Sequence, residues 1–277
     1  TSARARRDGL SQRVLTAEGR ERRGRTGYAD SVDLKPRFIL RLLMTTTVLV
    51  VLAAGSAVAL SPGTDVLIPA AARTGPWVTD LYLLNLGDGD AEKYRQFSVG
   101  RAEAFEACGM TDEVVPAATG IGSARDSDFT VVALASKHDF HNVENPRQVS
   151  AYNYPRDYGP RSPKFSRGGV LSLPCGGLFL ISGTAAIVGH SSCQTETISE
   201  QAEETFRNLQ SLLRSAGLED DLSALDAVRV YLRDRSDLAV VRGLVEPRFG
   251  RDTHITYLEG DICRRELDLE IDGVVFA

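Results

Sequence analysis

The C-terminal part of the chain alternates between patterns typical of strands and patterns typical of helices, and this alternation limits the possible folds more than any other feature. We expect strands over residues 177–190, 227–233, 254–258 and 266–275, with helices over 199–216 and 237–249 between them. The first of these strands is long enough to be a bent pair broken at Gly183 instead. Elements in this order predict an α+β layer, in which helices pack on one face of a mixed sheet.

The longer of the two helices carries clear start and stop signals. Thr197 and Glu200 have the spacing of a capping box, in which each side chain accepts a backbone N–H of the other residue. Gly217 stands where a glycine commonly ends a helix. The apolar residues that recur at helical spacing are Ala202, Phe206, Leu209 and Leu213. We expect this stripe to face the sheet.

Two of the predicted strands alternate between apolar and polar residues, so each has a core face and an opposite face. In residues 227–233 the opposite face carries Arg229, Tyr231 and Arg233. In the last strand it carries Glu266, Asp268 and Glu270. Three carboxylates on one face raise the pKa of one of them where water is excluded. An exposed acidic strand face is the simpler alternative.

The first 86 residues differ in composition from the rest. Residues 1–36 are rich in Arg, Gly and Ser without an apolar period, which is typical of a disordered basic tail. Residues 37–60 contain the most hydrophobic run, with 19 uncharged residues after Arg41. This run favours a signal peptide or a single membrane anchor over a buried helix. Residues 61–86 predict two short strands of unclear origin around a Gly-Pro turn.

Residues 87–170 begin with a turn and a helix. The helix is expected to place Tyr94, Phe97, Ala102 and Phe105 on one buried stripe. After it we predict a glycine-bearing turn at Pro116–Ser123 and a strand at Asp128–Ser136. Because no Lys follows the lone Gly-x-Gly of that turn, we expect no nucleotide site there.

Charge and cysteine content argue against two kinds of function. Residues 1–43 hold 11 Lys and Arg against 5 Asp and Glu, whereas the remainder holds 21 against 32. An acidic body argues against a nucleic-acid binder, because neutralising phosphates requires clustered basic residues. The cysteines lie far apart without a C-x-x-C pair, at Cys108, Cys175, Cys193 and Cys263. We therefore expect buried thiols in a reduced compartment, and neither a zinc site nor a disulfide framework.

Between Glu144 and His190 the sequence interleaves arginines and tyrosines with prolines and glycines. The basic and aromatic residues are Arg147, Arg156, Arg161, Arg167, Tyr152, Tyr154 and Tyr158. An arginine can bind a carboxylate through two parallel hydrogen bonds, and proline lowers the conformational entropy that a loop loses on binding. This segment predicts either a site that binds carboxylates or a solvated basic loop.

Several motifs closely resemble the chorismatase family, the chorismate-cleaving enzymes that include 3-hydroxybenzoate synthases. In the family's order they are GDGDAEKYRQFSVGR, NPRQVSAY, YGPRSPKFSR and ISGTAAIVGH. The resemblance covers about residues 87–275 and implies a RidA (YjgF) fold for the catalytic half, residues 171–277. Because family members carry a longer region before the first motif, we expect part of their N-terminal half to be missing here.

The resemblance implies an enzyme that cleaves the enolpyruvyl ether of chorismate to pyruvate plus 3-hydroxybenzoate or a dihydroxycyclohexadiene carboxylate. Such an enzyme requires no metal or organic cofactor. It requires cationic groups that hold two carboxylates, and an acid with a raised pKa. In the family the acid is a Glu of the closing segment, which here is Glu270. The candidate carboxylate-binding residues are Arg161 with Tyr158 beside it, then Arg147 and Arg233.

Cys263 corresponds to a position that separates 3-hydroxybenzoate formation, with Cys present, from plain hydrolysis in the family. Ala185 is more similar to the hydrolysing members, so the two residues favour different products. A free Cys is also typical of a small buried hydrophobic residue.

The alternative function is a truncated, non-enzymatic RidA-like module that forms trimers and is exported or membrane-tethered through residues 38–60. For the enzyme we expect a cytoplasmic protein that binds a small molecule and no nucleic acid. A homo-oligomer such as a trimer is expected, and contact with a membrane only where residues 38–60 are expressed.

Overall fold

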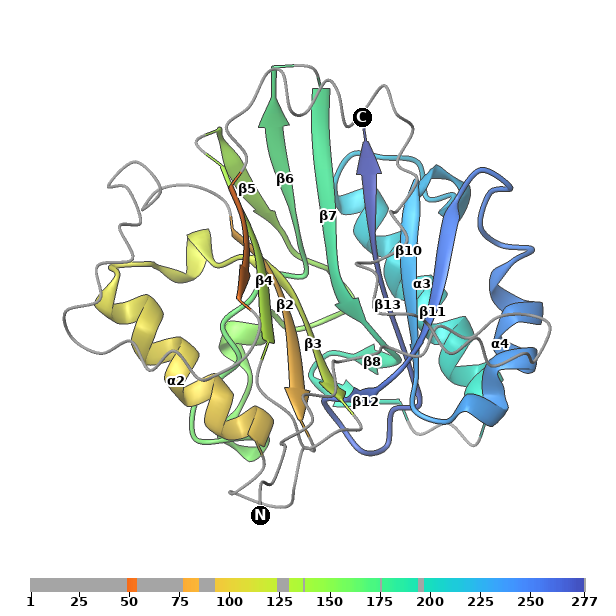
Figure 1. Cartoon of the computed structure of the whole chain (residues 1–277), viewed down its shortest axis with the longest axis horizontal. Coiled ribbons are helices and arrows are strands. Elements are labelled where there is room, and N and C mark those ends of the chain that lie inside the picture. The colour runs from red at the N-terminus through yellow and green to blue at the C-terminus, as the bar shows by residue number, and fades with distance from the viewer. Residues whose placement is uncertain are drawn as a thin grey trace, which may run out of the picture.

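The computed structural model of the chain describes residues 49–53, 77–84, 93–123, 130–136, 138–174, 176–193 and 197–276. Within these residues the strands form a six-stranded sheet, a five-stranded sheet and a short two-stranded ladder. Figure 1 shows helices α3 and α4 on one side of the two large sheets and helix α2 on the other. Strand β3 of the smaller sheet packs against β6 and β7 of the larger one.

The six-stranded sheet has the order β11-β10-β13-β7-β6-β5. Its strands are β5 (Phe140–Val143), β6 (Gly168–Leu173), β7 (Gly176–Thr184), β10 (Ala227–Leu232), β11 (His254–Glu259) and β13 (Leu269–Phe276). β10 runs parallel to β11, and the other neighbours are antiparallel. Helices α3 (Ile198–Ser215) and α4 (Leu238–Val245) pack on one face of this mixed sheet, which confirms the predicted α+β class.

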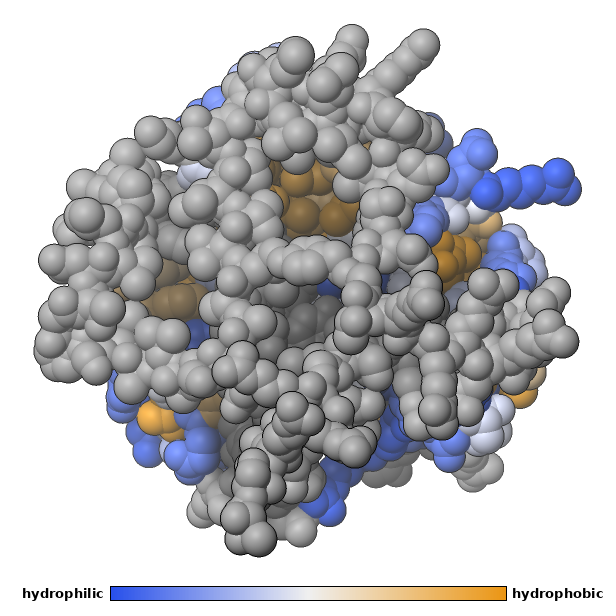
Figure 2. Space-filling model, viewed as in Figure 1, coloured by the Kyte–Doolittle hydropathy of each residue, from blue (hydrophilic) through white to orange (hydrophobic). Residues whose placement is uncertain are grey.

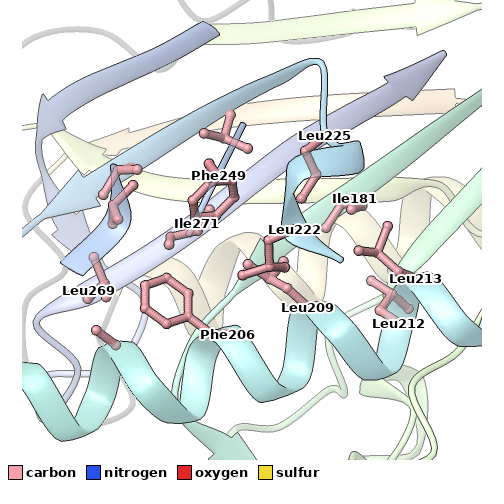
Figure 3. Packing of buried hydrophobic residues seen from close by; sticks show 14 of the residues in the cluster. Ile181, Phe206, Leu209, Leu212, Leu213, Leu222, Leu225, Phe249, Leu269 and Ile271 are labelled. Atoms are coloured by element: carbon pink, nitrogen blue, oxygen red, sulfur yellow. The ribbon is translucent and has the colours of Figure 1, made fainter. Parts of the chain in front are cut away.

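The main core lies between helix α3 and the six-stranded sheet. In Figure 3 the side chain of Phe206 points from α3 toward Leu269 and Ile271 of β13, and that of Leu213 points toward Ile181 of β7. Burying an apolar side chain of this size stabilises the fold by about 1.5–3 kcal/mol. Because Leu269 and Ile271 face α3, the residues that alternate with them on β13 point away from the helices. That opposite face is where the candidate site lies.

The predicted start and end of helix α3 are confirmed. The side chain of Thr197 accepts a hydrogen bond from the backbone N–H of Glu200, and the Glu200 carboxylate accepts one from the backbone N–H of Thr197 at 3.1 Å. After the helix, Gly217 has a φ of 76°, a left-handed conformation that glycine adopts without steric cost.

The five-stranded sheet has the order β1-β4-β2-β3-β12. Its strands are β1 (Leu49–Ala53), β2 (Trp77–Leu84), β3 (Ala117–Ser123), β4 (Thr130–Ala135) and β12 (Asp261–Ile262). The predicted turn at Pro116–Ser123 was wrong, because β3 is a regular strand parallel to β2. A β-carbon at Gly120 would lie 3.2 Å from the ring of Tyr94, so this glycine permits a close approach of helix α2 rather than a turn.

Part of the hydrophobic segment predicted at residues 37–60 is β-structure. Leu49–Ala53 form β1, which pairs antiparallel with β4 from Leu49 opposite Ala135 to Ala53 opposite Val131. The rest of that segment lies outside the described residues, as do residues 1–36. Among the helices that the structure describes, none has the length and apolar character needed to cross a membrane.

Helix α2 (Lys93–Ala107) confirms the predicted helix after the first motif, but its buried face is more polar than expected. Ala102 is buried as predicted, whereas Tyr94 is only half-buried. Ser98 and Arg101 are the other buried residues of this face, at 2% and 8% exposed. Because the charged residue Arg101 lies on the buried face, α2 packs against polar as well as apolar surroundings.

The remaining boundaries differ slightly from those predicted. Strand β7 ends at Thr184 and a short β8 (Ile187–Val188) follows, which pairs with β9 (Ser191–Ser192). Strand β13 begins three residues later than expected, so Glu266 lies in the turn before it and not on its face. Single 3-10 turns are η3 (Asp112–Val114), η4 (Ala151–Asn153), η5 (Arg156–Tyr158), η6 (Leu222–Ala224) and η7 (Arg235–Asp237).

On the face shown in Figure 2, the described residues around the lower and right-hand rim are mostly hydrophilic.

Candidate active site

A partly open cavity of about 380 Å³ lies between the two large sheets. Its walls come from helix α2, strand β3, residues 154–167, strand β7, residues 263–266 and strand β13. This volume falls within the usual range for pockets that bind small organic molecules. The six segments are distant in sequence, so the cavity depends on the whole fold.

Glu270 is the buried carboxylic acid of the cavity. It alternates with Leu269 and Ile271 on β13, points away from the helices and is 4% exposed. Its pKa is raised to about 8, first by burial and second by the neighbouring carboxylate of Asp272, while Arg167 opposes both. A carboxyl group in this environment carries its proton near neutral pH and can donate it to a bound molecule.

Arg167 is the positive charge that stands beside this acid. It immediately precedes β6, is 4% exposed, and lies 5.4 Å from the ring centroid of Tyr154. Its Nη2 donates to the carbonyl of Val149 at 2.9 Å and to the Tyr154 hydroxyl, whereas its Nε has no hydrogen-bond partner among the described residues. The guanidinium is therefore held in place with one donor available.

Helix α2 contributes a second buried arginine. Tyr94 and Arg101 are two helical turns apart, both line the cavity, and their side chains are hydrogen-bonded to each other. The Arg101 guanidinium lies 4.9 Å from the ring centroid of Phe97 and 5.8 Å from that of Phe165. Its Nε and Nη2 have no hydrogen-bond partner among the described residues. An arginine buried with unpaired N–H groups beside a cavity is suited to an anion.

The other end of the cavity is bordered by Arg264 and Tyr158. The Arg264 guanidinium lies 4.2 Å from the Tyr158 ring centroid and donates to the His190 carbonyl at 2.9 Å and to Ser192 Oγ at 3.0 Å. The Tyr158 hydroxyl lies 3.2 Å from His190 Nδ1. These contacts join Tyr158 and Arg264 to the turn between β8 and β9.

Three of the residues predicted from the sequence share this cavity. They are Glu270, Cys263 and Tyr158. Cys263 also packs against the small apolar cluster that contains Ala185 and Ile262, and the pKa of the Tyr94 hydroxyl is raised by burial first and by the neighbouring Cys263 second. Ala185, the second residue at which members of the family differ, lines the cavity as well.

The three predicted arginines lie elsewhere. Arg161 forms a solvent-exposed ion pair with Glu106. Arg147 is bound to Glu204 and donates to Asn208 Oδ1 at 2.9 Å, and both of these partners are buried residues of helix α3.

Arg233 holds the segment before β13 in place. It donates to Asp261 Oδ1 at 2.6 Å and to the carbonyls of Leu267, Ile262 and Arg264. Because acidic partners or carbonyls already occupy these three guanidinium groups, the positive charge of the cavity comes from other residues.

Arg101, Arg167 and Arg264 are the arginines that sequence reasoning missed. Arg167 lies among several arginines between Glu144 and His190 with no pattern that distinguishes it from them, and Arg264 follows Cys263 in a segment without a clear period. For Arg101 a signal existed, because it falls next to Ala102 on the predicted buried stripe of α2. A charge predicted to be buried is rarely placed there without a functional or structural partner.

Comparison with known proteins supports the resemblance first seen in the motifs. Residues 77–135 match the family described as Chorismatase FkbO/Hyg5-like, N-terminal. The match starts at Trp77, before the first motif, and so includes strand β2.

Curated relatives and a solved structure give the same result. A 3-hydroxybenzoate synthase of Streptomyces hygroscopicus is 39% identical over 196 residues, which are 66% of this chain and 57% of that protein. A chorismatase of Streptomyces rapamycinicus is 38% identical over 217 residues, which are 75% of this chain and 64% of that protein. A crystal structure of a chorismatase superposes with a TM-score of 0.67 and 36% identity, over 73% of this chain and 64% of the other. The chain therefore spans somewhat less than two thirds of the length of these relatives.

Proposed function

From its relationship to the chorismatases, we propose that this chain is a chorismate-converting enzyme that cleaves the enolpyruvyl ether and releases pyruvate. The observation that carries the proposal is the buried carboxyl of Glu270, which lines a cavity of about 380 Å³ and has a pKa of about 8. Ether cleavage begins with protonation of the enol carbon, and an acid of this pKa is still protonated at neutral pH.

The proton balance of the reaction defines the role of Glu270. Its carboxyl donates a proton to the terminal carbon of the enolpyruvyl group, which becomes the methyl group of pyruvate. With water, the water oxygen adds to the resulting cation and gives up a proton, the bond from that carbon to the ether oxygen breaks, and pyruvate and a dihydroxycyclohexadiene carboxylate are released. Without water, the bond between the ether oxygen and the ring carbon breaks, so that pyruvate leaves with that oxygen. The substrate's own hydroxyl then acts as the nucleophile at the vacated ring carbon, and loss of a ring proton, which restores the acid, gives 3-hydroxybenzoate. A general acid typically contributes about 10²–10⁴-fold in rate.

Two buried arginines are placed to hold the carboxylates of chorismate. Among the described residues, two nitrogens of Arg101 and one of Arg167 have no hydrogen-bond partner, and both arginines line the cavity with Glu270. Charge-assisted hydrogen bonds from a guanidinium are about twice as strong as neutral ones. Arg167 also lowers the pKa of Glu270, so a substrate carboxylate bound to Arg167 offsets that effect and favours the protonated acid.

Cys263 and Ala185 are placed to decide which product forms. Both line the cavity with Glu270, so either can contact the ring of a bound substrate. The two residues favour different products within the family, and a product analysis of the Cys263→Ala variant separates their effects. Loss of 3-hydroxybenzoate in favour of the diene assigns the product choice to the thiol.

The test of the proposed function is pyruvate release from chorismate by the purified full chain. We expect turnover in the unmodified protein and a loss of about 10²-fold or more in Glu270→Gln, which keeps the shape but lacks the proton. Undiminished release in this variant excludes the mechanism. A folded chain without any turnover favours the non-enzymatic alternative, and sizing of the same sample tests the predicted trimer.

A further inference from the structure

Strand β7 carries one residue more than β13 where the two strands pass the cavity. Ile271 pairs with Thr184 and Gly273 with Ile181, so Ser182 and Gly183 together oppose Asp272. A bulge of this kind removes backbone groups from the ladder and redirects the strand. Here it brings the α-carbon of Gly183 beneath the carboxyl group of Glu270.

Contacts with the other sheet hold this bulge in place. The backbone N–H of Gly183 donates to Thr119 Oγ1 on β3 at 3.1 Å. The hydroxyl of Ser182 donates to the Ser166 carbonyl at 2.6 Å and accepts from the Ala118 N–H at 2.9 Å. The position of the bulge, and with it the floor beneath Glu270, therefore depends on β3.

Asp272 connects these contacts to the strand that carries Glu270. It is 2% exposed, and its Oδ2 accepts from Thr119 Oγ1 at 2.7 Å and from the Tyr231 hydroxyl at 3.1 Å. Arg229 donates to both oxygens, from Nε at 2.8 Å and from Nη2 at 2.6 Å. With two hydroxyl groups and a bidentate guanidinium donating to it, the carboxylate of Asp272 is a fixed negative charge.

We propose that Asp272 is a positioning residue for the reaction, which holds the β7 bulge through Thr119 and keeps Glu270 in its protonated form. This proposal rests on the proposed function of Glu270 as the acid. Asp272 lies two residues from Glu270 on the same strand, so both side chains point to the same face. A negative charge at that distance disfavours a second one in a buried site.

Other charged and titratable groups around Glu270 also influence whether its carboxyl is protonated. Arg167 at the start of β6 favours the ionised form, whereas Asp272 disfavours it. From helix α2, Tyr94 faces Glu270 and is itself hydrogen-bonded to Arg101. The thiol of Cys263 faces Tyr94. From β10, Arg229 and Tyr231 donate to Asp272, and Tyr231 stands opposite Glu270 in the pairing of β10 with β13.

The test is a direct titration of Glu270 in the full chain, with and without the Asp272 charge. Infrared difference spectra recorded against pH show the carbonyl band of a protonated buried carboxyl, and Glu270→Gln assigns that band. In Asp272→Asn we expect the midpoint of the titration to fall by about one pH unit or more. The high-pH limit of pyruvate release should move down with it, which a purely structural role does not produce.

Two further variants keep the test decisive. Because Asp272→Asn removes the negative charge to which Arg229 donates, the double variant Arg229→Gln with Asp272→Asn serves where the single one does not fold. Asp268→Asn makes the same chemical change on the partly exposed side chain two residues before Glu270 and should leave the midpoint unchanged.

The outcomes separate the two proposals. An unchanged midpoint in the folded Asp272 variants overturns the positioning role, whatever the activity. A lowered midpoint in a chain that never releases pyruvate supports the effect of Asp272 on Glu270 and removes the proposed function.

Discussion

The carboxyl group of Glu270 lies directly over the α-carbon of Gly183. A β-carbon at position 183 would stand 1.9 Å from Glu270 Oε1 and 2.8 Å from its Cδ. Gly183 is not among the glycines with a positive φ, so what requires glycine here is the space that the acid occupies. The conformation of the Glu270 side chain therefore depends on the absence of a side chain at Gly183 on the neighbouring strand β7.

Replacing Gly183 by alanine should therefore displace the acid. We expect the Gly183→Ala chain to fold and to lose about 10²–10⁴-fold in kcat for pyruvate release, the usual contribution of a general acid. Steady-state kinetics measures the loss, and thermal melting followed by circular dichroism shows whether the fold is retained.

Gly243 in helix α4 provides the matched control. A β-carbon there meets nothing within 4 Å, so Gly243→Ala should leave kcat unchanged and stabilise the helix by about 0.5–1 kcal/mol. Equal activity losses in both variants contradict the specific role of Gly183.

The rate of the unmodified enzyme should fall at high pH. Glu270 acts as an acid only in its protonated form, and its pKa is about 8. We expect kcat for pyruvate release to be limited by this group above that pH and to decline about tenfold for each further unit. A kcat that stays level well above pH 8 is inconsistent with Glu270 as the acid.

The same pKa predicts a pH dependence of stability. The folded pKa of about 8 is raised above the ordinary value of 4.5, so between these two values the folded chain retains a proton that the unfolded chain has released. The contribution of Glu270 to the free energy of unfolding is therefore greatest at low pH and decreases as the pH rises toward about 8. Urea denaturation at several pH values measures it. The comparison is with the Glu270→Gln chain. Because Gln does not titrate, the difference in the free energy of unfolding between the unmodified chain and Glu270→Gln should vary with pH. Parallel curves of stability against pH for the two chains contradict a buried, protonated Glu270.

The sequence was most informative where a single local pattern determines structure. Alternation on β13 predicted that Leu269 and Ile271 face the core and that Glu270 points the other way, and the capping box at Thr197 located helix α3 to within one residue. Both depend on neighbours along the chain, which a sequence displays directly.

The sequence was least informative where distant segments meet. Arg161 and Arg167 are both loop arginines within the same motif, yet one binds Glu106 on the surface and the other lies beside Glu270. Their difference arises from helix α2 and strand β13, which are far from both in the sequence. The sequence suggested a break at Gly183 as an alternative, but not the bulge opposite Asp272, because a bulge depends on the register between β7 and β13.

Arginines that line the cavity can be distinguished from those outside it by their effect on substrate binding. Arg101→Met removes a buried guanidinium whose Nε and Nη2 have no partner among the described residues, while it keeps most of the apolar volume. A hydrogen bond to a charged group contributes about 1.5–3 kcal/mol, so KM for chorismate should rise by roughly 10–100-fold. The high-pH limit of kcat should move little, because Arg101 is not among the groups that shift the pKa of Glu270.

Arg161→Met is the corresponding change outside the cavity. The ion pair between Arg161 and Glu106 is partly exposed on both sides, with side chains 38% and 56% accessible, and such pairs contribute about 0–1 kcal/mol. We expect KM to change by less than about twofold, because the lost interaction involves no substrate. A large rise in KM for Arg161→Met, together with a small one for Arg101→Met, returns the carboxylate-binding role to the arginine that the sequence first suggested. In that case the loop that carries Arg161 has to close over the substrate.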